Sequence, residues 1–233
     1  CAYAQEALVP AERLIPLPDG ISSEVAAASL LKGMTVEFLI RRAFAVQPGQ
    51  TVLWHAAAGG VGLLACQWLA HLGARVIGTV STEQKAQIAR AHGCKETILY
   101  NQEDFAARVR ELTAGRGVPV VYDSVGRATL QGSLDSLQPR GLLVGFGNAS
   151  GKAEPLDLLQ LSQKGSLFVT RPTLFHYIAT REELLAASAA LFAVLQSGAV
   201  KVDVSLRRPL SGAAEVHRLL ETRATHGQAL LLP

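Results

Sequence analysis

Short apolar runs alternate with amphipathic segments through most of the chain. The runs predict buried strands and the segments between them predict helices, because strands and helices differ in the period of their apolar positions. The six expected strands cover 51–56, 75–80, 96–101, 118–125, 141–147 and 166–171. The expected helix starts are Gly60, Thr82, Gln102 and about Thr129. Near-continuous apolar strands alternating with helices predict an α/β fold with a doubly wound, six-stranded parallel sheet.

The N-terminal part lacks this alternation. Prolines and a Pro-Asp-Gly turn predict short antiparallel strands and loops over 1–20. An Ala- and Leu-rich helix is expected over 22–31, and a second helix over 35–44. The sequence opens at Cys1 within what reads as the middle of a strand, so we expect a fragment of a longer protein.

The C-terminal part departs from the alternation after Arg171. The pattern predicts a long helix with Thr180 as its N-cap, then a strand over 200–206, a short helix over 211–221 and a terminal strand over 228–233. This order does not extend the strand–helix rhythm. We therefore expect the segment to pack with the N-terminal residues as a second lobe.

Residues 51–62, TVLWHAAAGGVG, carry the order of strand, glycine-rich turn and helix that a dinucleotide-binding turn requires. Gly59 would let the backbone approach a pyrophosphate, and Gly62 would let the helix pack closely on the strand. The free N–H groups at the helix start would then face the phosphates. The first glycine of the usual motif is Ala57 here, so a tight turn that binds nothing is the alternative.

The end of the second strand favours NADP over NAD. An NAD site usually has an acidic residue there for the ribose hydroxyls, whereas this strand runs into Ser81 and Thr82. Small hydroxyl residues at a helix start, with Lys85 one turn later, suit a phosphate monoester. Glu83 lies inside the helix start, where an acid complements the helix dipole. An exposed helix-surface lysine is the alternative interpretation of Lys85.

Composition argues against several other classes of protein. The net charge of +3 and the scattered basic residues give little support to nucleic-acid binding. No apolar run approaches the ~18–20 residues of a membrane span. Cys1, Cys66 and Cys94 are odd in number and widely spaced, which argues against a disulfide framework or a CxxC zinc site. A reducing, cytoplasmic setting is therefore expected.

A series of motifs follows in order along essentially the whole chain. They are LVPAERLIPLPDGIS, LLKGMTVEFLIRR, HAAAGGVG, GTVSTEQKAQIAR, VVYDSVG, LDSLQPRGLLVGFGNASG, KGSLFVTRPTL and ETRATHGQALLLP. Together they resemble the quinone oxidoreductase (zeta-crystallin-like) branch of the medium-chain dehydrogenase/reductase superfamily. The resemblance implies a Rossmann sheet with an incomplete α+β (GroES-like) substrate lobe. It also implies an NADPH-dependent, zinc-independent reductase of quinones or related α,β-unsaturated carbonyls, usually a homodimer.

The resemblance further implies which residues contact the cofactor. The phosphate turn would comprise Ala57, Ala58, Gly59, Gly60, Val61 and Gly62. The 2′-phosphate pocket would comprise Ser81, Lys85, Tyr100 and Arg223, with Gly78 and Thr79 beneath it. The nicotinamide side would comprise Val125, Phe146, Gly147 and Asn148, with Thr35 near the nicotinamide ribose and Arg171 as a weaker candidate. No catalytic residue and no metal ligand is assigned, because the cofactor carries the hydride chemistry.

Several of these residues have structural alternatives. Tyr100 also suits an ordinary strand end, Arg223 a surface position, and Phe146 the core. His55 and Asp123 are interpreted as structural, the latter because a carboxylate beside the nicotinamide has no evident proton to move.

The resemblance divides the chain into three parts. Residues 1–32 would be a remnant of the substrate domain, 33–171 the NADPH-binding Rossmann domain, and 172–233 a return to the substrate domain. The family has further substrate-lobe residues before the point that matches Cys1. Two functions therefore stay open: an NADPH:quinone or enone reductase, and a truncated NADPH-binding module without turnover that serves as a sensor or binding partner.

Overall fold

The computed structural model describes residues 3–222 and 227–233 and contains one large sheet. Its strand order is β3-β2-β1-β4-β5-β6, and each neighbouring pair is parallel. The strands are β1 (Thr51–Trp54), β2 (Arg75–Val80), β3 (Glu96–Leu99), β4 (Val118–Asp123), β5 (Leu137–Gly145) and β6 (Phe168–Thr170). The predicted six-stranded parallel sheet is confirmed, and the direction of winding changes between β1 and β4.

Helices cover both faces of this sheet. They are α2 (Gly60–His71), α3 (Glu83–Ala91), α4 (Phe105–Leu112), α5 (Leu130–Asp135) and α6 (Leu158–Gln163). Successive strand residues point to opposite faces. Val52 and Trp54 of β1 accordingly pack in one core with α2 and α3, whereas Leu53 packs in a second core with α4 and α5. The central strands of the sheet are therefore buried on both sides, as their apolar residues predict.

A long N-terminal helix, α1 (Ser23–Phe38), continues into a π-helical turn at Leu39–Ala43. The prediction of two separate helices is wrong, because Gly33 does not end the helix: a Cβ at this position would overlap the methyl groups of Leu191, so the glycine permits close packing. The expected boundary between residues 32 and 33 falls inside α1. The predicted N-terminal strands are also wrong, since the described residues before α1 contain a 3₁₀ turn, Ala11–Arg13, and no strand.

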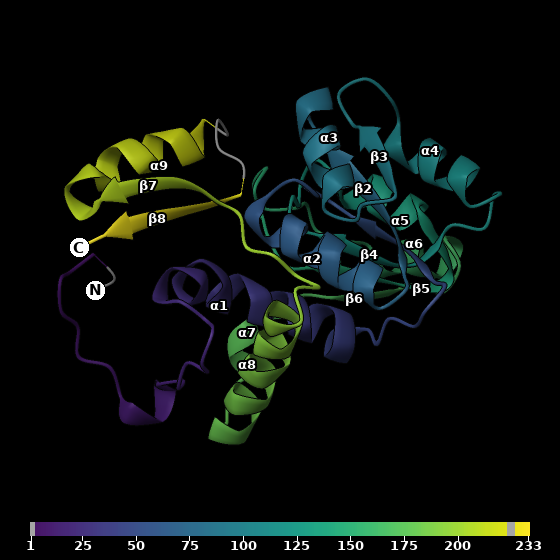
Figure 1. Ribbon diagram of the computed structural model, residues 1–233. Coiled ribbons are helices and arrows are strands. Elements are labelled where there is room, and N and C mark those ends of the chain that lie inside the picture. Colours follow the sequence, from purple (N-terminus) through teal and green to yellow (C-terminus); the bar gives the residue numbers. More distant parts are fainter. Residues whose placement is uncertain (1–2, 223–226) are drawn as a thin grey trace.

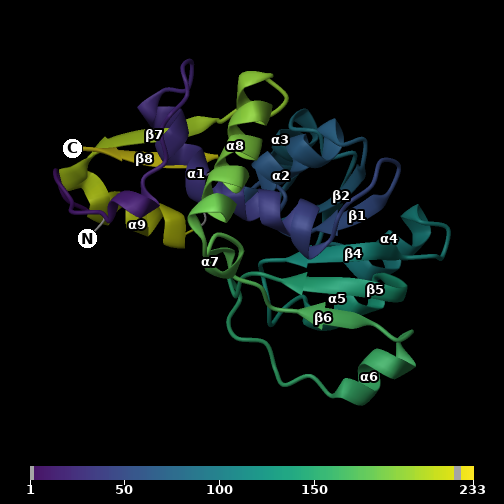
Figure 2. The ribbon, with the colours of Figure 1, turned by 90° about the horizontal axis from the view of Figure 1, so that it is seen from below.

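The C-terminal segment forms a small sheet beside the large one. Its elements are α7 (Leu174–Tyr177), α8 (Arg181–Gln196), β7 (Val204–Pro209), a 3₁₀ turn (Leu210–Gly212), α9 (Ala213–Glu221) and β8 (Gln228–Leu232). Thr180 caps α8 as predicted, accepting the N–H of Glu183 at 3.2 Å. β7 and β8 pair in parallel. Figures 1 and 2 show this pair and α9 apart from the large sheet, while α1 contacts α2, α8 and β8.

Candidate functional site

The carboxyl ends of the six parallel strands lie at one edge of the large sheet, and the loops that follow them carry most of the predicted site residues. Those residues are Ala57–Gly62 after β1, Ser81 after β2, Tyr100 after β3, Val125 after β4, Phe146–Asn148 after β5 and Arg171 after β6. In doubly wound folds, ligands bind outside this edge at the point where the winding changes. That point lies between β1 and β4 here.

The turn after β1 adopts a strained conformation. Ala56 has a φ of 55°, in the left-handed region that favours glycine. The N–H of Gly59 donates to the Ala56 carbonyl at 2.9 Å, and the twelve-residue helix α2 begins at the next residue. A Cβ on Gly62 would lie 2.5 Å from the carbonyl oxygen of Ala56 and 2.6 Å from that of Ala57. Close packing of helix and strand therefore requires glycine at position 62.

Gly78 and Thr79 of β2 lie beneath this turn. A Cβ on Gly78 would come within 2.5 Å of the Ala57 Cβ. The carbonyl of Thr79 accepts the N–H of Ala57 at 3.1 Å, and its hydroxyl lies 2.9 Å from Nδ1 of His55. Both residues thus act on the turn itself, through its backbone and its packing.

Lys32 of α1 also lies at the glycine turn, because its side chain reaches the first residue of α2. A Cβ on Gly60 would lie 3.0 Å from the Lys32 Nζ and 2.9 Å from Oε1 of Gln228 in β8. The Lys32 ammonium donates to this amide oxygen, and Nε2 of Gln228 donates to the Gly60 carbonyl at 2.8 Å. Burial lowers the pKa of Lys32. Only the packing of α1 and β8 onto α2 reveals this position, since no motif marks it.

Ser81 and Tyr100 directly follow β2 and β3, and Lys85 lies in the first turn of α3. Thr82 is the N-cap of α3, and its hydroxyl accepts the N–H of Lys85 at 3.3 Å. The N–H of Tyr100 donates to the Val80 carbonyl at 3.3 Å, and its side chain is 41% exposed. The segments that follow two adjacent strands therefore carry a hydroxyl, an ammonium and a phenol.

Glu83 is the acid nearest to this group in the sequence, and its carboxylate is engaged elsewhere. It forms an ion pair with Arg90, about two turns further along α3. Arg90 also donates to the hydroxyl of Thr97 in β3, at 2.5 Å. The Glu83 charge is therefore partly balanced by an arginine of the same helix.

The loops after β4 and β5 pack against each other on the other side of the winding change. The N–H of Ser150 donates to the Val125 carbonyl at 2.8 Å. A Cβ on Gly147 would overlap the carbonyl of Ser124, so glycine is required there. The ring of Phe146 lies 5.5 Å from the tryptophan ring at the end of β1, centroid to centroid. Val125 and the 146–148 loop are thus held side by side.

The remaining predicted residues make other contacts. The hydroxyl of Thr35 donates to the Leu31 carbonyl within α1, at 2.7 Å. Arg171 donates to the Gly145 carbonyl at 2.9 Å, which ties the end of β6 to β5. Asn148 is exposed. Arg223 lies outside the described residues.

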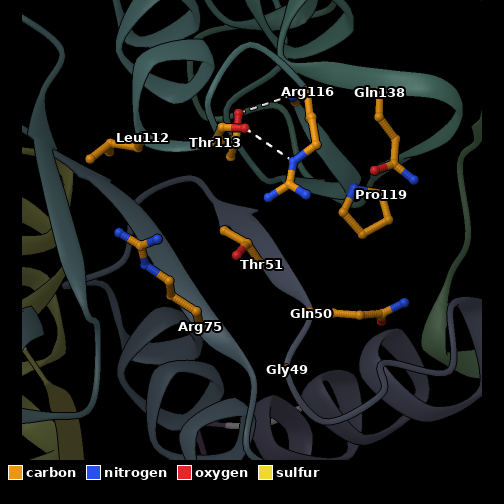
Figure 3. A pocket seen from close by; sticks show the side chains of 10 residues that line it. Gly49, Gln50, Thr51, Arg75, Leu112, Thr113, Arg116, Pro119 and Gln138 are labelled. Atoms are coloured by element: carbon orange, nitrogen blue, oxygen red, sulfur yellow. Dashed lines mark hydrogen bonds between the residues drawn. The ribbon is translucent and has the colours of Figure 1, made fainter.

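A cavity lies at the opposite, amino-terminal edge of the large sheet (Figure 3). Two of its arginines already have partners: Arg75 pairs with Glu96 at 2.9 Å, and Nε of Arg116 donates to the Thr113 carbonyl at 3.3 Å. Another hollow lies between α8 and a proline-rich segment over 15–18. The lining residues of neither cavity include a predicted cofactor contact.

No helix within 3–222 or 227–233 has the length and apolar character needed to cross a membrane. In the same part of the chain, no cluster of three or more His, Cys, Asp or Glu side chains could hold a metal ion. Cys66 and Cys94 are buried and form no disulfide.

Comparisons with known proteins agree with this fold. Residues 60–192 match a family model described as zinc-binding dehydrogenase. The full chain is 51% identical to a quinone oxidoreductase of Pseudomonas aeruginosa, covering 71% of it, and 48% identical to a 2-haloacrylate reductase of a Burkholderia species, also covering 71%. The crystal structure of Escherichia coli quinone oxidoreductase complexed with NADPH has a TM-score of 0.97 and 52% identity, over 100% of this chain and 72% of that one. The chain therefore belongs to the quinone oxidoreductases of the medium-chain dehydrogenase/reductase superfamily.

Proposed function

We propose that this protein binds NADPH and transfers a hydride from it to a quinone or a related α,β-unsaturated carbonyl. The observation that carries the proposal is the glycine turn at the start of α2, beside a strand end with hydroxyl and lysine side chains where NAD sites have an acid. The Escherichia coli relative is a quinone oxidoreductase complexed with NADPH. The Burkholderia relative is named for the reduction of a haloacrylate, a conjugated alkene.

The turn has the room and the charge for a pyrophosphate. A Cβ on Gly59 would have one neighbour, the Ala56 carbonyl at 3.2 Å, so the backbone is open to a ligand on its other side. The first turn of α2 contains no acidic residue and no side-chain cap. The helix dipole and the Lys32 ammonium both favour an anion at this end. These features would hold the two central phosphates.

The 2′-phosphate would bind to Ser81, Lys85 and Tyr100. A lysine and a hydroxyl offer charge-assisted hydrogen bonds to a phosphate monoester. The pairing of Glu83 with Arg90 lowers the repulsion that a carboxylate would exert on this phosphate. Arg223 stays a predicted fourth contact.

The chain supplies orientation, and the reduced nicotinamide supplies the hydride when it is bound. Val125, Phe146, Gly147 and Asn148 would flank the ring, and Thr35 and Arg171 stay predicted contacts. A quinone is already a strong electrophile, so this chemistry requires no metal ion to polarise the acceptor. We therefore propose a zinc-independent reaction.

We further propose a homodimer in which a second copy pairs along β6. This strand ends the sheet, and its outer edge pairs with no strand of the described residues. Phe168 is 60% exposed and Val169 is 41% exposed. Leu158 and Leu159 of α6 are exposed as well. An unpaired, apolar strand edge is a template for pairing with another chain. The expected domain boundaries and the cytoplasmic setting stay predictions.

Loss of NADPH absorbance in the presence of a quinone tests the reaction. We expect quinone-dependent oxidation above the rate without protein, and a higher kcat/KM with NADPH than with NADH. Binding of NADPH without oxidation would instead favour the binding-module alternative. Absence of NADPH binding would overturn the proposal.

A lysine variant tests the cofactor preference. Lys85→Ala removes a charge-assisted hydrogen bond of about 1.5–3 kcal/mol, so the Kd for NADPH should rise about tenfold or more while the Kd for NADH stays the same. Lys164→Ala is the matched control: Lys164 follows α6, pairs with Asp135 at the end of α5, and is none of the proposed cofactor contacts. Equal losses for both cofactors would refute the 2′-phosphate role of Lys85.

A further inference from the structure

Four buried polar side chains form a continuous series of hydrogen bonds behind the glycine turn. The hydroxyl of Thr79 lies 2.9 Å from Nδ1 of His55, and Nε2 of His55 lies 3.0 Å from the Ser133 hydroxyl. Ser133 donates to Oδ2 of Asp123 at 2.9 Å. Each of the four residues is at most 3% exposed. We call Thr79, His55, Ser133 and Asp123 the buried network.

The carboxylate sets the direction of these hydrogen bonds. An ionised Asp123 only accepts, so the Ser133 hydroxyl donates to it and accepts the Nε2–H of His55. A neutral His55 then has a free lone pair on Nδ1, which accepts from the hydroxyl of Thr79. Burial lowers the pKa of His55 against the opposing charge of Asp123, which favours this neutral form. The tautomer of His55 follows from its partners.

The ends of the buried network reach both halves of the proposed cofactor site. At one end, the Thr79 hydroxyl accepts the N–H of Ala56 at 3.4 Å, the residue with the strained φ. At the other end, Oδ1 of Asp123 accepts the N–H groups of Val125 at 2.7 Å and Gly126 at 3.0 Å. The network thus joins the turn after β1 to the loop after β4 across the winding change.

We propose that the buried network positions the nicotinamide: it fixes the loop at Val125 relative to the glycine turn, with His55 as the central positioning residue. This inference rests on the proposed NADPH site. NADPH bound at the glycine turn must also contact the loop at Val125. A shift of one of these contacts relative to the other would misplace the nicotinamide, which is the reacting half of the cofactor. Apolar side chains would fill the same space without the cost of burying polar groups. A fully bonded network instead specifies one arrangement of the segments that it joins.

Affinities for two ligands distinguish a role in positioning the nicotinamide from a general effect on folding. Adenosine 2′,5′-bisphosphate has the adenine half of NADPH and no nicotinamide. With Ser133→Ala, which removes both hydrogen bonds of this hydroxyl and leaves little empty space, we expect at least a fivefold weaker binding of NADPH and less than a twofold change for the bisphosphate. His55→Leu also removes two links, among them the one to Thr79, and should produce the same difference between the two ligands. Equal losses for both ligands would overturn the inference.

A matched control is a buried threonine outside the network. Thr113 is 7% exposed, and its hydroxyl donates to the Val109 carbonyl at 2.7 Å and accepts the Gly117 N–H at 2.9 Å. Thr113→Val should lower the free energy of unfolding without changing the ratio of the two affinities. A ratio that changes as much as in Ser133→Ala would show a general effect of lost stability and overturn the inference.

A double-mutant cycle tests whether His55 carries the coupling. Thr79→Val and Ser133→Ala break the network on opposite sides of His55, so their effects on the NADPH Kd should not add: the double variant should bind about as weakly as the weaker single variant. Additive effects would show independent contacts and overturn the role of His55. A wild-type chain that does not bind NADPH would overturn the proposed function and this inference together.

Discussion

At the scale of single residues, the burial of His55 makes the stability of the folded protein depend on pH. In the folded protein, burial depresses its pKa, and the facing charge of Asp123 only partly opposes this. In the unfolded chain, the pKa returns to about 6.5. Below that pH the imidazole binds a proton in the unfolded chain but stays neutral in the folded protein. The stability contributed by neutral, buried His55 is therefore fully present above about pH 6.5 and is lost as the pH falls.

Chemical unfolding at two pH values measures this effect. From about pH 6.5 to about pH 5.5, the proton on unfolded His55 costs the wild type at most about 1 kcal/mol, a limit reached when the folded form takes up no proton in this range. His55→Gln lacks the titrating group, so the difference in unfolding free energy between wild type and variant should shrink by about this amount. A difference that does not change between the two pH values contradicts the prediction.

Single residues differ in how well the sequence predicts them. Gly62 is predictable because a helix that starts directly after a buried strand leaves no room for a Cβ, and the two backbone oxygens at 2.5 and 2.6 Å confirm this. Lys32 and Ser133 are not predictable, because their roles depend on how α1 and α5 pack beside the turn. His55 and Asp123 were expected to be structural, and the path that connects them becomes visible only in three dimensions.

At the scale of elements, α1 depends on Gly33 for its contact with α8. A Cβ on Gly33 would overlap the side chain of Leu191, which is fully buried. Gly33→Ala gains about 1 kcal/mol of helix propensity and loses about 1–3 kcal/mol to overpacking, so we expect a net loss of stability. Leu191→Ala should cost about 2–5 kcal/mol alone and clearly less in the Gly33→Ala background. Thermal unfolding of the four proteins measures the coupling, and additive losses would contradict it.

Elements with a strong pattern are also the ones that the sequence predicts correctly. The six apolar runs appear as strands because a sheet covered on both faces needs apolar residues at nearly every position. The helix break near Gly33 is wrong because tertiary packing, rather than local propensity, decides what this glycine does. The expected N-terminal strands are wrong because their apolar residues, such as Leu8 and Leu14, are exposed and find no strand partner in the described chain.

At the scale of the whole molecule, α1 links the two sheets. It contacts α2, which covers the large sheet, and β8 of the small sheet. Gln228 of β8 in turn donates a hydrogen bond to the glycine turn. Composition and pattern predict a large parallel sheet with a smaller second part. They do not predict that the C-terminal segment reaches the glycine turn, because Gly60 and Gln228 are separated by most of the sequence.

The proposed homodimer rests on the exposed outer edge of β6. A two-fold axis beside β6 would pair this strand with its copy and join the two large sheets, burying Phe168 and Val169. Phe168→Asp places a charge in that contact, so light scattering should show a shift from dimer to monomer with thermal stability lowered only by the lost association. Thr97→Asp is the matched control on β3, the opposite edge strand, and should leave the dimer intact. A wild type that is monomeric at all concentrations would overturn the proposed homodimer, and a Phe168→Asp variant that stays dimeric would place the contact elsewhere.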